Sequence, residues 1–176
     1  MTLATSDGIK TALERNVKAV TLRPSVGQGT AVTRVRLGTD LRCEIEEGPW
    51  KLTAGMTEKY GGDGSAPNPG VLGRAALGSC LAIGYAMWAA RLEVPIASLE
   101  VEIHADYDVR GELGVSDEVR PGYGEVRYVV KVESDAAAED VARVLETAER
   151  CSSWLDIVAN ATPMRREVQI TSAARS

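Results

Sequence analysis

The stretch that decides the fold runs from Asn68 to Arg91 and reads NPGVLGRAALGSCLAIGYAMWAAR. Asn68 is a good helix N-cap and Pro69 suits a first turn, so we predict a helix over residues 70–91. No charged residue occurs from Ala75 to Ala90, although a run of about 20 apolar residues is typical of a membrane span. Because Ala, Gly and Ser dominate it, we predict instead a helix that protein covers on every side, between the subunits of a dimer.

Periodicity outside this helix predicts an α+β arrangement. Residues 98–108 alternate strictly between apolar and polar side chains, which is typical of a strand with one face in water. The same reasoning predicts six strands in all, at residues 31–37, 41–46, 50–57, 98–108, 124–133 and around Val168 and Ile170. Helical spacing predicts three further helices, at residues 7–18, 136–149 and 152–159.

Composition narrows the function classes. The 176 residues carry a formal net charge of −5 without a basic stripe, which argues against a nucleic-acid partner. Residues 1–20 lack the apolar run of a signal peptide, so we expect a cytoplasmic protein whose thiols stay reduced. We expect neither a membrane partner nor a structural disulfide framework from its three cysteines.

Several chemistries lack the residues they need. The single histidine, His104, falls on the polar face of an alternating strand, so a Ser-His-Asp triad is not expected. No Cys-x-x-Cys pair is present, and the Gly-Gly-Asp-Gly run at residues 61–64 lacks the Lys of a phosphate loop. We therefore expect no metal and no organic cofactor.

The thiols remain as candidates for chemistry. Cys43 shares the apolar face of a predicted strand, and we interpret it as a small buried hydrophobe. Cys80 lies inside the apolar helix, where the same interpretation is the ordinary one. Cys151 follows one predicted helix and begins the next, where unpaired N–H groups and the helix dipole favour a thiolate. The Trp154 side chain, three residues further on, would shield this thiol from water. The alternative interpretation is that Cys151 only caps the junction between two helices and has no chemical role.

Two segments resemble the motifs of the OsmC/Ohr family. Residues 68–80 are similar to the family's active-site helix, which begins Asn-Pro-Glu and leads to a reactive cysteine. Residues 151–163 are similar to its second cysteine motif. The resemblance covers about residues 30–171, so we divide the chain into an N-terminal helix and linker, 1–29, and an OsmC-like domain, 30–176. It implies two antiparallel sheets flanking long central helices in an intertwined homodimer.

The resemblance also implies a reaction. The Cys80 thiolate would attack the O–O bond of an organic hydroperoxide and become a sulfenic acid. Cys151 would condense with it to a disulfide, which a dithiol such as dihydrolipoamide would reduce.

The chain departs from the family pattern at two points. Gly70 stands where the family has Glu, and residues 57–60, the region upstream of the Asn-Pro turn where the family has an Arg, contain Lys59 as their cation and no Arg. A point charge does not replace a guanidinium fork. Other arginines could supply one, at positions 34, 36, 42 or 74. The second hypothesis is therefore a non-peroxidase relative that binds a small apolar or electrophilic ligand at the same site.

Overall fold

The protein is described here from a computed structural model, which describes residues 6–171. Its helices are α1 (Ser6–Leu22), α2 (Pro69–Leu92), α3 (Val109–Glu112), α4 (Ala138–Arg150) and α5 (Ser153–Ala159), with 3-10 turns at Pro24–Gly27 and Glu58–Tyr60. Its strands are β1 (Arg34–Leu37), β2 (Cys43–Glu47), β3 (Trp50–Ala54), β4 (Ser98–Asp106) and β5 (Glu125–Glu133). The prediction of a mixed α+β fold with two antiparallel sheets is confirmed.

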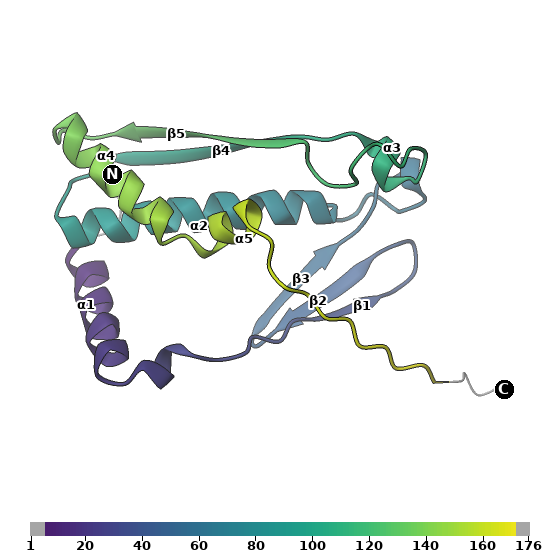
Figure 1. Cartoon of the computed structure of the whole chain (residues 1–176), viewed down its shortest axis with the longest axis horizontal. Coiled ribbons are helices and arrows are strands. Elements are labelled where there is room, and N and C mark those ends of the chain that lie inside the picture. Colours follow the sequence, from purple (N-terminus) through teal and green to yellow (C-terminus); the bar gives the residue numbers. More distant parts are fainter. Residues whose placement is uncertain (1–5, 172–176) are drawn as a thin grey trace.

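The long helix α2 is the axis of the molecule (Figure 1). Its first turn forms as the sequence predicts, because the Asn68 side chain accepts a hydrogen bond from the Val71 N–H at 3.0 Å and Pro69 occupies the first helical position. At the other end Glu93 adopts a left-handed backbone with φ 59° and stops the helix. In Figure 1 the β4–β5 hairpin lies along one side of α2, while α4 and α5 run back across it.

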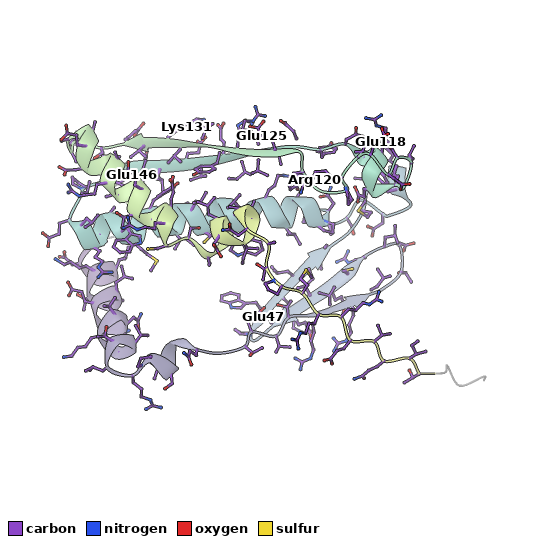
Figure 2. All side chains as sticks on the ribbon, viewed as in Figure 1. Glu47, Glu118, Arg120, Glu125, Lys131 and Glu146 are labelled. Carbon is purple, nitrogen blue, oxygen red and sulfur yellow. The ribbon has the colours of Figure 1, made fainter. Side chains whose placement is uncertain are left out.

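The hairpin places its apolar face on α2. β4 and β5 pair antiparallel over their whole length, from Ser98 opposite Glu133 to Asp106 opposite Glu125. Alternate side chains pack toward α2, and the others face water. Figure 2 shows Lys131 and Glu125 on the side of the hairpin away from α2. The strict alternation in the sequence thus matches a strand with one wet face.

The core forms where α2, α4 and the hairpin meet. Leu77, Leu81 and Tyr85 of α2 are buried together with Ala148 of α4. The Tyr85 Oη donates a hydrogen bond to Glu149 Oε1 at 2.8 Å, so its polar tip is satisfied inside the core. Burial, followed by this hydrogen bond, raises the pKa of Tyr85. The core therefore binds the α4–α5 segment tightly to the middle of α2.

The three-stranded sheet β1-β2-β3 has no comparable core within the described residues. Val35 faces Ile45, and Ile45 faces Leu52, in a regular antiparallel register. Even so, the Trp50 side chain is 72% exposed. β2 begins only at Cys43, because Asp40 and Leu41 form the preceding turn with φ of 55° at both residues. Cys43 is half-buried on this sheet.

One prediction about the fold needs correction. The strand expected around Val168 and Ile170 is wrong: residues 160–171 form no strand, and Ile170 is 90% exposed. A strand needs a partner to satisfy its backbone groups, and the described part of the chain offers none there. Ile83 of α2 is 60% exposed in the single chain, so the expectation that protein covers this helix on every side, between the subunits of a dimer, stays a prediction.

By length and composition alone, α2 is the one helix among the described residues that could cross a membrane. Its buried side carries Leu81 and Tyr85, which pack against α4 and the hairpin as in the core of a globular domain.

The helix expected at residues 7–18 is present as α1, which is longer and spans Ser6–Leu22. The division of the chain at residue 29 into an N-terminal segment and an OsmC-like domain stays a prediction.

Candidate functional site

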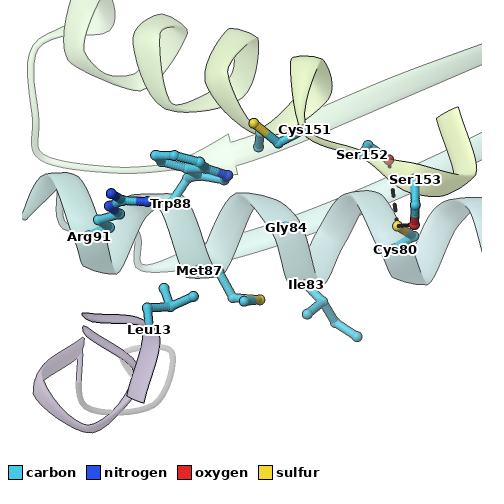
Figure 3. Close-up of a pocket in the computed structure, with 11 residues that line it drawn as sticks. Leu13, Cys80, Ile83, Gly84, Met87, Trp88, Arg91, Cys151, Ser152 and Ser153 are labelled. Atoms are coloured by element: carbon cyan, nitrogen blue, oxygen red, sulfur yellow. Dashed lines mark hydrogen bonds between the residues drawn. The ribbon is translucent and has the colours of Figure 1, made fainter. Parts of the chain in front are cut away.

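Cys80 and Cys151 line one cavity of about 350 Å³ between α2 and the α4–α5 junction. Cys80, Gly84, Met87 and Arg91 follow one another at helical spacing along a stripe of α2. A Cβ at Gly84 would lie 3.9 Å from the Cβ of Ala148, which is ordinary van der Waals contact, so α2 and α4 pack against each other at this point. The full lining is Leu13, Cys80, Ile83, Gly84, Met87, Trp88, Arg91, Ala148, Cys151, Ser152 and Ser153 (Figure 3).

Two serine hydroxyls approach the Cys80 thiol. The Cys80 Sγ lies 3.5 Å from Ser152 Oγ and 3.9 Å from Ser153 Oγ. The Ser152 Oγ also accepts a hydrogen bond from the Leu155 N–H at 3.3 Å, as the N-cap of α5. With an oxygen lone pair occupied in this way, the hydroxyl proton is free to point at the sulfur.

This environment favours the thiolate form of Cys80. Burial opposes ionisation, but the Ser152 hydroxyl, the Trp154 N–H and the Ser153 groups donate to the sulfur and outweigh it. Together they hold the pKa of the Cys80 thiol below its ordinary value. A lowered pKa on a half-buried cysteine that lines a cavity is typical of a reactive thiol rather than an inert one.

Cys151 occupies a different position from the one predicted. It is the C-cap of α4, where its N–H bonds back to Ala148 and Glu149, and Ser152 is the residue that caps α5. The expectation that Cys151 begins the next helix is therefore wrong, and the N–H groups of that turn face Cys80 instead. Cys151 is exposed, and Figure 3 shows its side chain on the Trp88 side of the cavity. All three cysteines are free thiols.

The other predicted site residues lie outside the cavity lining. The Lys59 Nζ sits 5.7 Å from the Tyr60 ring centroid. The Trp154 side chain is partly exposed, and only its backbone N–H reaches toward Cys80. The roles proposed for Lys59 and Trp154 stay predictions.

None of the four candidate arginines lines the thiol cavity. Arg36 pairs with Glu46, and Arg42 donates to Ser65. Arg74 lines a second cavity and donates to the Tyr123 Oη at 2.8 Å, while Arg34 lies on the exposed strand β1.

The cation of the thiol cavity is instead Arg91, whose guanidinium lies 4.8 Å from the centroid of the Trp88 ring. Sequence reasoning missed Arg91, although it lies eleven residues after Cys80 on the same stripe of α2. It also missed Ser152 and Ser153, for which the signal was the N-cap preference of serine before residues 153–159.

The surroundings of Gly70 are crowded at the position where the family pattern has Glu. A Cβ at this position would lie 3.1 Å from Arg74 Nη1 and 3.3 Å from Tyr123 Oη. The Arg74–Tyr123 pair therefore takes the space next to the position where the family carries Glu.

Comparison with known proteins agrees with the fold. A family model described as OsmC-like protein matches residues 62–167, which is more than half of the chain. No curated protein matches the sequence. The OsmC-like protein of Mycoplasma pneumoniae is similar in structure, with a TM-score of 0.65 at 10% identity, covering 76% of this chain and 90% of that chain.

Two organic hydroperoxide resistance proteins are also similar in fold. The OsmC protein of Legionella pneumophila has a TM-score of 0.53 at 14% identity over 74% of this chain and 89% of that one. The protein of Elizabethkingia anophelis has a TM-score of 0.55 at 11% identity over 76% and 91% of the two chains. With its family match, its helix-borne Cys80 and its second thiol at the same cavity, the chain belongs to the OsmC-like protein family.

Proposed function

We propose that this protein reduces organic hydroperoxides with Cys80 as the attacking thiol. The observation that carries the proposal is the 3.5 Å approach of the Ser152 hydroxyl to Cys80 Sγ at the wall of an apolar cavity. The hydroxyl stabilises a thiolate, which is the nucleophilic form of cysteine. Ile83, Met87 and Trp88 supply apolar surface for the organic part of a substrate.

The reaction balances with two thiols and an external dithiol. The thiolate of Cys80 attacks the terminal oxygen of ROOH, the O–O bond breaks, and the departing alkoxide takes a proton from water to become ROH. Cys80 is then a sulfenic acid. The Cys151 thiol condenses with it, forming a disulfide and releasing water. A dithiol such as dihydrolipoamide reduces that disulfide and leaves as its own cyclic disulfide.

The position of Cys151 supports a resolving role. Cys151 lines the same cavity as Cys80 and lies between α4 and α5, next to Ser152 and Ser153. It is exposed, so a reductant can reach a disulfide that includes it. Disulfide formation requires the Cys151 side chain to turn from the Trp88 side of the cavity toward Cys80 (Figure 3).

We also propose that the protein works as a cytoplasmic homodimer. Apolar side chains on the open side of α2 and on the β1–β3 sheet are exposed, which is costly for a monomer in water. They include Val35, Leu37, Trp50, Leu52, Val71 and Ile83. A second copy that covers these surfaces would bury the exposed side of α2. Light scattering on the purified protein tests whether its mass in solution is that of two chains.

One observation favours the alternative, a non-peroxidase that binds a small apolar or electrophilic ligand. The polar neighbours of Cys80 are hydroxyl and backbone groups, with no guanidinium among its hydrogen-bond partners in the described chain. A neutral donor stabilises transition-state charge less than an arginine does. Such a site would still react with electrophiles through its thiolate.

The test is peroxide consumption by the purified protein, supplied with cumene hydroperoxide and dihydrolipoamide. We expect turnover in the wild type, loss to the level of free dithiol in Cys80→Ser, and unchanged turnover in Cys43→Ser, whose thiol lies on strand β2. If wild type with intact thiols gives no turnover above free dithiol, the peroxidase proposal is wrong and the ligand-binding alternative takes its place.

A further inference from the structure

Helix α1 contributes to the thiol cavity although it lies outside the region that matches the family, residues 62–167. It packs against α2, and in Figure 1 it meets the C-terminal part of that helix. The contact uses one end of α1 only. Ile9, Lys10, Ala12 and Leu13 are half-buried, whereas residues 14–22 are exposed.

An ion pair secures this contact. Lys10 Nζ of α1 binds a carboxylate oxygen of Glu93, the residue that ends α2. The carboxylate is mostly exposed, and water weakens an ion pair in such a position. The pair therefore orients α1 more than it stabilises the fold, and apolar packing by Leu13 must do the rest.

Leu13 is the α1 residue that reaches the cavity. It lines the cavity together with Ile83 and Met87 of α2. Figure 3 shows Leu13 below Met87, on the opposite side of α2 from Ser152 and Ser153. The cavity is thus bounded by the α4–α5 junction on one side and by α1 on the other.

We infer that α1 is a wall that limits the size of molecules that reach Cys80 through the cavity, with Leu13 as the size-determining residue. This inference rests on the proposed function only in taking those molecules to be hydroperoxides. A shorter side chain at position 13 widens the cavity, and a larger one narrows it beside Ile83 and Met87. A change of one or two carbon atoms in an apolar pocket alters selectivity by about tenfold.

The test compares alkylation of individual cysteines by a small reagent, iodoacetamide, and a bulky one, a fluorescein maleimide. Peptide mass spectrometry follows each thiol in wild type, Leu13→Ala, Leu13→Trp and the control Leu22→Ala, whose side chain is 75% exposed at the end of α1. Cys43 lies outside the cavity lining and reports folding in every variant.

We expect Leu13→Ala to raise the rate for the bulky reagent at Cys80 severalfold relative to iodoacetamide, and Leu13→Trp to lower it by about tenfold. Rates at Cys43 and in Leu22→Ala should match wild type. Equal rate ratios at Cys80 in all four proteins would overturn the inference.

The same variants are then assayed with tert-butyl and cumene hydroperoxides. A shift in alkylation without any peroxide turnover would leave the wall in place and refute only the peroxidase proposal. Turnover whose preference between the two peroxides is identical in all four proteins would overturn the inference while the peroxidase stands.

Discussion

The Ser152 hydroxyl stands 3.5 Å from the Cys80 sulfur while its oxygen accepts the Leu155 N–H, so one serine both caps α5 and orients toward the thiol. In this chain the residue after Cys151 therefore takes part in the environment of Cys80.

Replacing this serine should make Cys80 less reactive. Ser152→Ala removes a donor that lowers the pKa of Cys80, so less thiolate is present at neutral pH. A hydrogen bond of about 1 kcal/mol corresponds to about a fivefold slower alkylation by iodoacetamide. The pH profile of that rate should move to higher pH.

Two matched variants separate this effect from a loss of structure. Ser153→Ala removes the more distant hydroxyl, 3.9 Å from the sulfur, and should have a smaller effect. Ser152→Thr keeps a hydroxyl and should restore most of the reactivity. An unchanged pH profile in Ser152→Ala would show that the hydroxyl does not act on the thiolate.

Oxidation should link the two cavity thiols. One equivalent of cumene hydroperoxide is expected to give a Cys80–Cys151 disulfide, which peptide mapping under non-reducing conditions identifies. In Cys151→Ser the sulfenic acid on Cys80 has no resolving thiol and should be trapped by dimedone. A disulfide that includes Cys43 instead would contradict the assignment of Cys151.

Tyr85 should make stability sensitive to alkaline pH. The pKa of Tyr85 is raised by burial and by the hydrogen bond to Glu149. The unfolded tyrosine loses its proton near pH 10, at about its ordinary pKa, while the folded one keeps it. Its contribution is therefore full below pH 10 and declines above it, by about 1.4 kcal/mol per pH unit.

Urea unfolding across this pH range checks the prediction. Tyr85→Phe should cost about 1–2 kcal/mol at neutral pH, because Glu149 loses its partner, and should flatten the alkaline decline. Tyr107→Phe is the control, because that side chain is 71% exposed. If stability falls with the same slope above pH 10 in Tyr85→Phe, the loss of stability belongs to other groups, such as Tyr128, whose pKa is also raised by burial.

Gly62 should tolerate no side chain. A Cβ there would lie 2.0 Å from the backbone oxygen of Met56, which cannot move aside as a side chain would. Gly62→Ala is expected to lower the free energy of unfolding by about 1–3 kcal/mol. Gly8→Ala in α1 is the counterpart, since nothing lies within 4 Å of its added Cβ, and it should stabilise by about 0.5–1 kcal/mol. Thermal unfolding checks both variants: Gly62→Ala should lower the melting temperature and Gly8→Ala should raise it.

The sequence alone was enough to place the elements that depend on near neighbours in the chain. Asn68 and Pro69 start α2 because capping acts over three residues, and the alternation from Leu99 to Ala105 yields β4 because a strand repeats every two residues. The spacing of the two cysteine motifs pointed to the family that the family match confirms.

Only the tertiary structure decided what surrounds the thiols. The contact between Cys80 and Ser152 spans 72 residues of sequence, and the one between Lys10 and Glu93 spans 83. No periodicity encodes such contacts, because they depend on how α4, α5 and α1 dock onto α2. The expected strand around Val168 and Ile170 was wrong for the same reason: its pattern was local, but a strand exists only where another strand accepts its hydrogen bonds.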